Sequence, residues 1–161
     1  MVDARIVDIL RRLSLRLEKS GVNWAIAGSL GLAIRGAPVE PHDIDITTNR
    51  KGAYEIQRMF LEFVTRGVAF RVGDRIRSHF GALEIDGVKI EIIGDFETKL
   101  EDGSWQKPPA LASVIEVVQF EGMSIPVLSL EHECDSYTKL GRLERAEQAR
   151  ALLIASRHKD S

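Results

Sequence analysis

Two alternating apolar runs, one on each side of Asp86-Gly87, restrict this chain to folds that contain an antiparallel β-hairpin. Asp-Gly is typical of a two-residue hairpin turn, because both residues tolerate the left-handed backbone that the turn requires. With this turn, Glu84 lies opposite Lys89 and Ala82 lies opposite Glu91. We expect the first pair to form a cross-strand ion pair on the polar face. The opposite face is entirely apolar and consists of Leu83, Ile85, Val88, Ile90 and Ile92.

The other elements follow from the spacing of apolar residues and from the turn residues between them. The stretch 67–79 shows no decided period, and 101–110, with its glycine and prolines, reads as a surface loop. Ser129 is a predicted N-cap for the first of two final helices, which meet near Gly141. The remaining predicted elements are, in chain order, a helix over 6–17, a buried strand over 24–27, a short helix over 30–34, a strand over 43–47, a helix over 53–64 and paired strands over 114–120 and 123–127.

This order of elements predicts an α+β fold: a mixed β-sheet with helices packed on one side and a short pair of C-terminal helices. At 161 residues the chain is expected to form one domain, with a core over 1–128 and a helical extension of it over 129–161. The net charge of −2 argues against a dedicated nucleic-acid binder.

A single cysteine, Cys134, excludes an internal disulfide and a zinc site built on paired cysteines. The sequence shows neither a signal peptide at its start nor an apolar run of the roughly 18 residues that a membrane span needs. We therefore expect a cytoplasmic protein that does not enter a membrane.

Asp43 and Asp45 stand two residues apart on a predicted strand, so both carboxylates leave the same face. Two neighbouring acids resist joint ionisation unless a cation lies between them, and carboxylate oxygens suit a hard ion such as Mg²⁺. Glu91 lies on the polar face of the hairpin and can join them if the hairpin is adjacent. Three acids suffice to arrange two metal ions, one on an attacking oxygen and one on a polyphosphate.

The Gly28-Ser29 turn offers a complementary feature, because it joins a buried strand to the start of a helix. Glycine permits close approach of the backbone, and the first N–H groups of a helix are free to bind an anion. The Ser29 hydroxyl adds a further donor. We therefore interpret Gly28 and Ser29 as a phosphate-binding turn.

At these residues the chain resembles the DNA polymerase beta-like nucleotidyltransferase superfamily, as a small single-domain member. The pattern is Gly28-Ser29, then Asp43-Ile44-Asp45, then Glu91 on a neighbouring strand, and the resemblance covers about residues 22–95. It implies a polymerase beta palm-like fold. A lysine of the C-terminal helix, here Lys139, is similar to one that approaches the phosphates in related enzymes.

The resemblance implies Mg²⁺-dependent transfer of a nucleoside monophosphate from a nucleoside triphosphate, expected to be ATP, with release of pyrophosphate. Asp43 and Asp45 would hold one or two metal ions, and Glu91 would orient or deprotonate the acceptor hydroxyl. This sequence has Glu where the superfamily usually has Asp as the third acid, so Asp95 is an alternative for that role.

The acceptor stays open among a small molecule, a protein side chain and an RNA end. An alternative function is an antitoxin-like or catalytically degenerate interaction module of the same fold. A second copy of the chain, or a helical partner protein, could supply the missing wall of the cleft. A Rossmann site is disfavoured because the sequence lacks the G-x-G-x-x-G pattern, and a P-loop is disfavoured because Gly-Lys-Ser/Thr is absent.

Overall fold

In the computed structural model, which describes residues 1–159, the Asp86-Gly87 hairpin lies within one eight-stranded sheet. The predicted register is confirmed, with Glu84 opposite Lys89 and Ala82 opposite Glu91. The strands are β1 (Trp24–Ala27), β2 (Ile44–Thr48), β3 (Val64–Val72), β4 (Ile76–Ile85), β5 (Val88–Lys99), β6 (Trp105–Gln106), β7 (Ile115–Phe120) and β8 (Met123–Leu128).

The sheet has the order β3-β4-β5-β2-β1-β8-β7, and the short β6 pairs with the end of β5. β2 runs parallel to β5 and β1 runs parallel to β8, whereas the other neighbours are antiparallel. The predicted mixed sheet is therefore confirmed. The hairpin formed by β4 and β5 lies directly beside β2, where the sequence analysis needed it.

Three of the helices have a polar N-cap residue at their start. Asp3, Asn49 and Ser129 each accept a hydrogen bond from a backbone N–H of the first turn that follows, as an N-cap does. The helices are α1 (Ala4–Glu18), α2 (Gly28–Ile34), α3 (Arg50–Met59), α4 (Leu130–Lys139) and α5 (Leu143–Lys159), with single 3₁₀ turns η1 (Leu61–Phe63) and η2 (Leu111–Val114).

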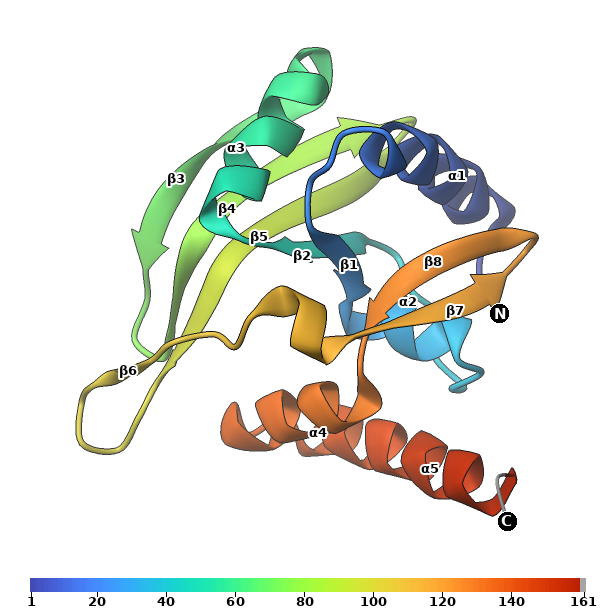
Figure 1. The fold of residues 1–161 in the computed structure, drawn as a ribbon, viewed down its shortest axis with the longest axis vertical. Coiled ribbons are helices and arrows are strands. Elements are labelled where there is room, and N and C mark those ends of the chain that lie inside the picture. Colours follow the sequence, from blue (N-terminus) through green and yellow to red (C-terminus); the bar gives the residue numbers. More distant parts are fainter. Residues whose placement is uncertain (160–161) are drawn as a thin grey trace.

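The main hydrophobic core lies between the sheet and helices α1, α2 and α3, and it includes the whole apolar face of the hairpin. A second, smaller cluster joins α2 and the segment after it to the C-terminal helices. Its buried members are Leu32, Ala37, Val39, Leu130, Tyr137, Ala146 and Ala149. Figure 1 shows the result: α1 and α3 lie on one side of the sheet, and the α4–α5 pair lies at the opposite end of the molecule.

Two segments differ from the sequence-based expectation. The undecided stretch 67–79 forms most of β3 and the start of β4, and β3 lacks a clear alternation because most of its side chains are at least partly exposed. The helix predicted over 53–64 starts at Arg50 and ends at Met59, where η1 and then β3 begin. Within residues 1–159, no helix combines the length and the apolar composition needed to cross a membrane.

Candidate active site

Asp45 lies at a junction of three strands. It pairs with Ala27 of β1 on one side and with Glu91 of β5 on the other. Glu91 is in register with it on a parallel strand, so both side chains leave the same face of the sheet. Asp43 stands just before β2 and is exposed to solvent. The structure thus brings Asp45 and Glu91 side by side, with Asp43 at the same strand end.

The electrostatics of Asp45 reflect this crowding. Burial is the largest cause that raises its pKa, and the negative charges of Glu91 and Asp43 raise it further, to about 7. The positive charges of Arg142 and Lys89 act in the opposite direction. Asp45 therefore lies in a partly buried region with excess negative charge, which a cation would compensate.

Lys89 does not form the ion pair expected with Glu84. Its Nζ instead lies 2.8 Å from Oε1 of Glu91, two residues further along the same strand face. The hydrogen bond to Glu91, with the charges of Asp43 and Asp45, raises the pKa of Lys89. The expectation was wrong because Glu91 on the same strand, with Asp43 and Asp45 at the start of the neighbouring one, places more negative charge near the ammonium group than the single exposed Glu84 does.

Gly28 begins α2 directly beside Asp45. Its φ of +69° lies in the left-handed region, which favours glycine. A Cβ at this position would overlap Oδ2 of Asp45, so the carboxylate packs against the glycine backbone. Ser29 follows as the second residue of α2. The turn predicted to bind phosphate and the strand predicted to bind metal are therefore in direct contact.

Glu133 of α4 completes this arrangement, although the sequence analysis assigned it no site role. The N–H of Gly28 donates to its Oε1 at 3.0 Å. Burial raises the pKa of Glu133 to about 7, and the hydrogen bond from Gly28 opposes that rise. A signal was present: Glu133 stands at helical spacing between Leu130 and Tyr137, in the stripe that α4 buries.

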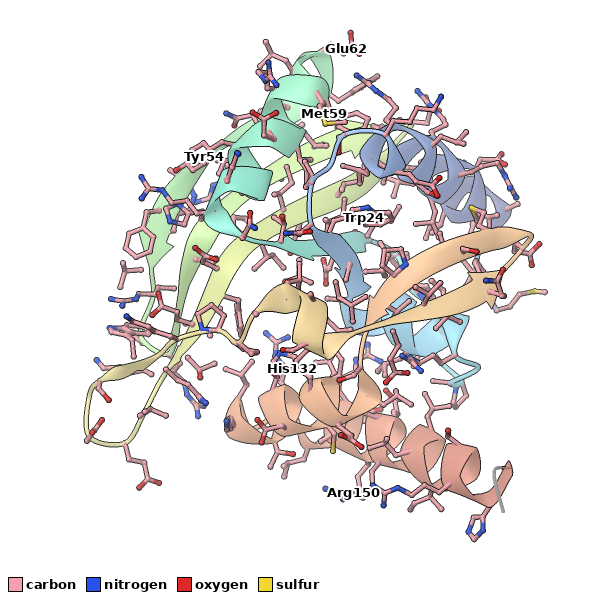
Figure 2. The ribbon with its side chains drawn as sticks, viewed as in Figure 1. Trp24, Tyr54, Met59, Glu62, His132 and Arg150 are labelled. Carbon is pink, nitrogen blue, oxygen red and sulfur yellow. The ribbon has the colours of Figure 1, made fainter. Side chains whose placement is uncertain are left out.

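Gly28, Asp45 and Glu133 open on a cavity of about 720 Å³ between the sheet, the segment 106–114 and α4, whereas Ser29, Asp43 and Glu91 are not among its lining residues. Lys139 and Arg142 line the same cavity, and the charge of Arg142 acts on both Asp45 and Glu133. In Figure 2, His132 marks the α4 wall, beneath the η2 turn. One wall of the cavity thus comes from α4 and the turn that follows it in the same chain.

Lys139 is the last residue of α4 and faces this cavity. Its Nζ lies 2.8 Å from Oδ2 of Asp135 and donates to Oε1 of Gln106 at 3.0 Å. Arg75, from the turn between β3 and β4, donates to the carbonyl oxygen of Lys139 at 3.1 Å. The long strands therefore reach across to the end of α4 and hold Lys139 at the cavity wall.

Asp95, the alternative third acid, lies in an irregular part of β5. His79 and Arg77 of β4 pair with Gly94 and Glu97, so β5 has one residue more than its partner there, and Asp95 has φ +48°. Such a β-bulge redirects side chains, and Asp95 lines the cavity. Asp45 pairs with Glu91, and Asp95 lies four residues further along β5. Of the two candidates for the third acid, Glu91 is therefore the one in register with Asp45.

The donor set suits a hard cation, because Asp43, Asp45 and Glu91 offer only carboxylate oxygens. Within the described residues 1–159, no three Asp, Glu, His or Cys side chains are gathered into a ready-made metal site. Mg²⁺ commonly binds through one or two carboxylates and completes its shell with water and substrate phosphates. The carboxylate on the Gly28 turn, with its raised pKa, fits that mode of binding.

Comparison with known proteins places this geometry in a family. A family model described as aminoglycoside-2''-adenylyltransferase matches residues 9–152. A crystal structure from Thermotoga maritima, of a protein whose nucleotidyltransferase assignment is itself inferred, is 49% identical, covers 96% of both chains and has a TM-score of 0.85. A search of the curated proteins finds no match.

More distant structures share the fold. Lincomycin-bound LnuA, a lincosamide antibiotic adenylyltransferase, is 10% identical over 94% of this chain and 98% of its own, with a TM-score of 0.59. ANT(2'')-Ia in complex with adenylyl-2''-tobramycin is 13% identical over 98% of this chain and 100% of its own, with a TM-score of 0.60. These likenesses agree with the α+β architecture.

Proposed function

The chain belongs to the aminoglycoside-2''-adenylyltransferase family and is a nucleotidyltransferase, and on this premise we propose that it transfers an adenylyl group from ATP to a hydroxyl of a small molecule, with Mg²⁺. The observation that carries the proposal is the position of Asp45. It is in register with Glu91, packs against the Gly28 turn and faces a cavity of about 720 Å³.

In this proposal the reaction forms a bond between the acceptor oxygen and the α-phosphorus and breaks the bond to the β-phosphate, so that pyrophosphate leaves. Asp43 and Asp45 would hold Mg²⁺, which would neutralise phosphate charge when bound. Glu91 accepts the proton of the acceptor hydroxyl, since it lies in register with Asp45 and leaves the same face. Asp95 stays the alternative for this role.

The phosphates would lie along the wall formed by the Gly28-Ser29 turn and Lys139. Gly28 and Lys139 line the same cavity, one at the start of α2 and the other at the end of α4. The Lys139 ammonium is available as a counter-charge if its contacts with Asp135 and Gln106 rearrange. Adenine is proposed as the base because the family is one of adenylyltransferases.

A small-molecule acceptor is favoured by the size of the cavity. Its volume of about 720 Å³ lies within the range of small-molecule sites, which is roughly 300–1,000 Å³. The related proteins bind lincomycin and an adenylylated tobramycin. We therefore place hydroxyl-bearing antibiotics and similar compounds ahead of a protein side chain or an RNA end.

The experiment is pyrophosphate release from ATP and Mg²⁺ with a panel of hydroxyl-bearing acceptors. Asp43→Asn and Asp45→Asn should each reduce release by at least about a hundredfold, because each removes a metal-binding charge. Glu84→Gln is the matched control, since Glu84 is an exposed acid on the neighbouring β4–β5 hairpin. Circular dichroism would verify that every variant is folded.

Unchanged pyrophosphate release in both aspartate variants would overturn the proposed function. The alternative, an antitoxin-like or degenerate interaction module, makes the opposite prediction. Such a protein would not consume nucleotide, and its association with a partner protein would survive both aspartate substitutions.

A further inference from the structure

One buried acid has no part in the mechanism proposed above. Glu133 is only 7% exposed, and an ionisable side chain is rarely buried to this extent without a specific partner. Its partner is a backbone group 105 residues away, the N–H of Gly28, which it meets at 3.0 Å. This hydrogen bond is a direct connection between the C-terminal helices and the strand-to-helix turn beside Asp45.

Glu133 is held in place by a backbone hydrogen bond at the start of α4 and by two buried neighbours on the same helix face. Ser129 caps α4, and its carbonyl oxygen accepts the N–H of Glu133 at 3.0 Å. Leu130 and Tyr137, on the same face of α4, are buried in the cluster that joins α4 and α5 to the end of α2. The carboxylate therefore extends from a rigid support, which is what a residue that orients another group requires.

Gly28 in turn supports Asp45. Its backbone occupies the left-handed region and leaves no room for a side chain, because Oδ2 of Asp45 fills that space. A rotation of the Gly28 peptide would change the surface against which this carboxylate rests. The Gly28 N–H, which is partly buried, would also lose its acceptor, and an unsatisfied N–H shielded from water is costly.

We propose that Glu133 is a positioning residue for the nucleotidyl transfer: by accepting the Gly28 N–H, it fixes the turn that holds the Asp45 carboxylate in place for the metal. The inference rests on the proposed function, and it adds a residue of α4 to those that shape the active site. Glu133 does not touch the reacting atoms. What it supplies is an acceptor oxygen at the right distance, and its negative charge is dispensable for this purpose.

Two substitutions separate these properties. Glu133→Gln keeps the length and the acceptor oxygen but removes the charge, whereas Glu133→Asp keeps the charge but falls short by one methylene. Glu131→Ala is the control, because Glu131 lies on the same helix with its side chain 75% exposed. Both test substitutions preserve most of the buried volume, so both variants are expected to fold.

The first readout needs no substrate. In NMR spectra of the full chain without metal, the Gly28 amide proton and the Asp45 carboxyl carbon should stay near their wild-type shifts in Glu133→Gln and move in Glu133→Asp. The second readout is kcat with ATP and Mg²⁺. It should fall on the order of tenfold in Glu133→Asp and stay within about threefold in Glu133→Gln, as for other residues that orient a metal ligand.

The proposal is overturned if Glu133→Asp leaves the Asp45 carboxyl shift and kcat unchanged, or if Glu133→Gln is the more damaged of the two. Either result would mean that the hydrogen bond does not position Asp45. A wild-type protein that fails to consume ATP would contradict the proposed function instead. In that case the NMR shifts still decide whether Glu133 fixes the turn.

Discussion

At Gly28, any side chain would displace the Asp45 carboxylate. Gly28→Ala would place a methyl group on Oδ2 of Asp45 and force an L-residue into φ +69°. We expect a loss of about 1–3 kcal/mol in the free energy of unfolding and at least a tenfold lower kcat. Urea unfolding and pyrophosphate release would measure the two effects.

Gly36 provides the control for this substitution. It has φ +97°, but nothing lies within 4 Å of the place where its Cβ would be. Gly36→Ala should therefore show the backbone strain without the loss of activity. Equal loss of activity in both variants would show that strain in the chain, and not contact with Asp45, explains the effect of Gly28→Ala.

The buried Glu133 predicts a pH dependence of stability. Burial raises its pKa from 4.5 to about 7, so the folded chain binds this proton more tightly than the unfolded chain does. The stability that protonation provides is thus present below about pH 4.5 and is lost as the pH rises through 7. The groups that face Glu133 are Asp45, Arg35, Arg142 and Tyr137.

Glu133→Gln removes this titration and leaves those facing groups in place. The free energy of unfolding of the variant, relative to that of the wild type, should rise by on the order of 3 kcal/mol as the pH increases from 4.5 to 8. Denaturant titrations at several pH values would measure the gain. A constant difference between the two proteins over this range would contradict the raised pKa.

Single elements were predicted well where the chain buries one face and poorly where it does not. The β4–β5 hairpin was assigned to the correct register because its apolar face is continuous with the main core. β3 was not predicted, because its residues are all at least partly exposed and its apolar residues do not alternate with polar ones. In α4, Glu133 was assigned no site role, because an acid in the first turn of a helix is already favourable there and needs no further explanation.

The contact between the β3–β4 turn and the end of α4 leads to a prediction about these two elements. Arg75 donates to the carbonyl oxygens of Lys139 and Leu140, at 3.1 and 3.5 Å. Arg75→Ala should speed hydrogen exchange of the amides from Leu140 to Arg142 and cost about 0.5–1 kcal/mol of stability, since cations commonly satisfy the last carbonyls of a helix. Mass spectrometry of exchanged peptides would measure this change.

Arg71→Ala is the comparison, because Arg71 donates to carbonyl oxygens of Gly67 and Phe80 within its own strand pair. Its loss should leave exchange at the end of α4 unchanged. Faster exchange there in both variants would mean that the strands act on α4 through general loosening and not through the contact of Arg75.

At the scale of the whole molecule, the α+β class and the mixed sheet were predicted, whereas the origin of the cavity wall was not. The sequence analysis looked for that wall in a second chain, but α4 lines the cavity from within the same chain. A contact between residues 28 and 133 leaves no local pattern, so periodicity could not reveal it. We propose that the described part of the C-terminal segment, residues 129–159, folds as part of the same domain, through the cluster around Ala149.

Ala149→Glu tests this organisation. Ala149 is fully buried, and a charge there should detach α4 and α5 and cost at least about 3 kcal/mol. Limited proteolysis should then cut near residue 129, and pyrophosphate release should be lost. Ala151→Glu, at an exposed site of the same helix, should do neither. Resistance to proteolysis in both variants would contradict the proposal.

The bulge at Asp95 gives β5 two different alternations along its length. Ile93 and Asp95 line the cavity before the extra residue takes effect, and Phe96 and Thr98 line it afterwards, while Glu97 faces Arg77 on the other side. Removal of Asp95 would restore ordinary pleating: Phe96 would follow Gly94 on the cavity side, and Glu97 would stay opposite Arg77. The pocket would then lose the carboxylate of Asp95 and keep the aromatic ring of Phe96, so a deletion of three nucleotides in the gene could change which compounds fit.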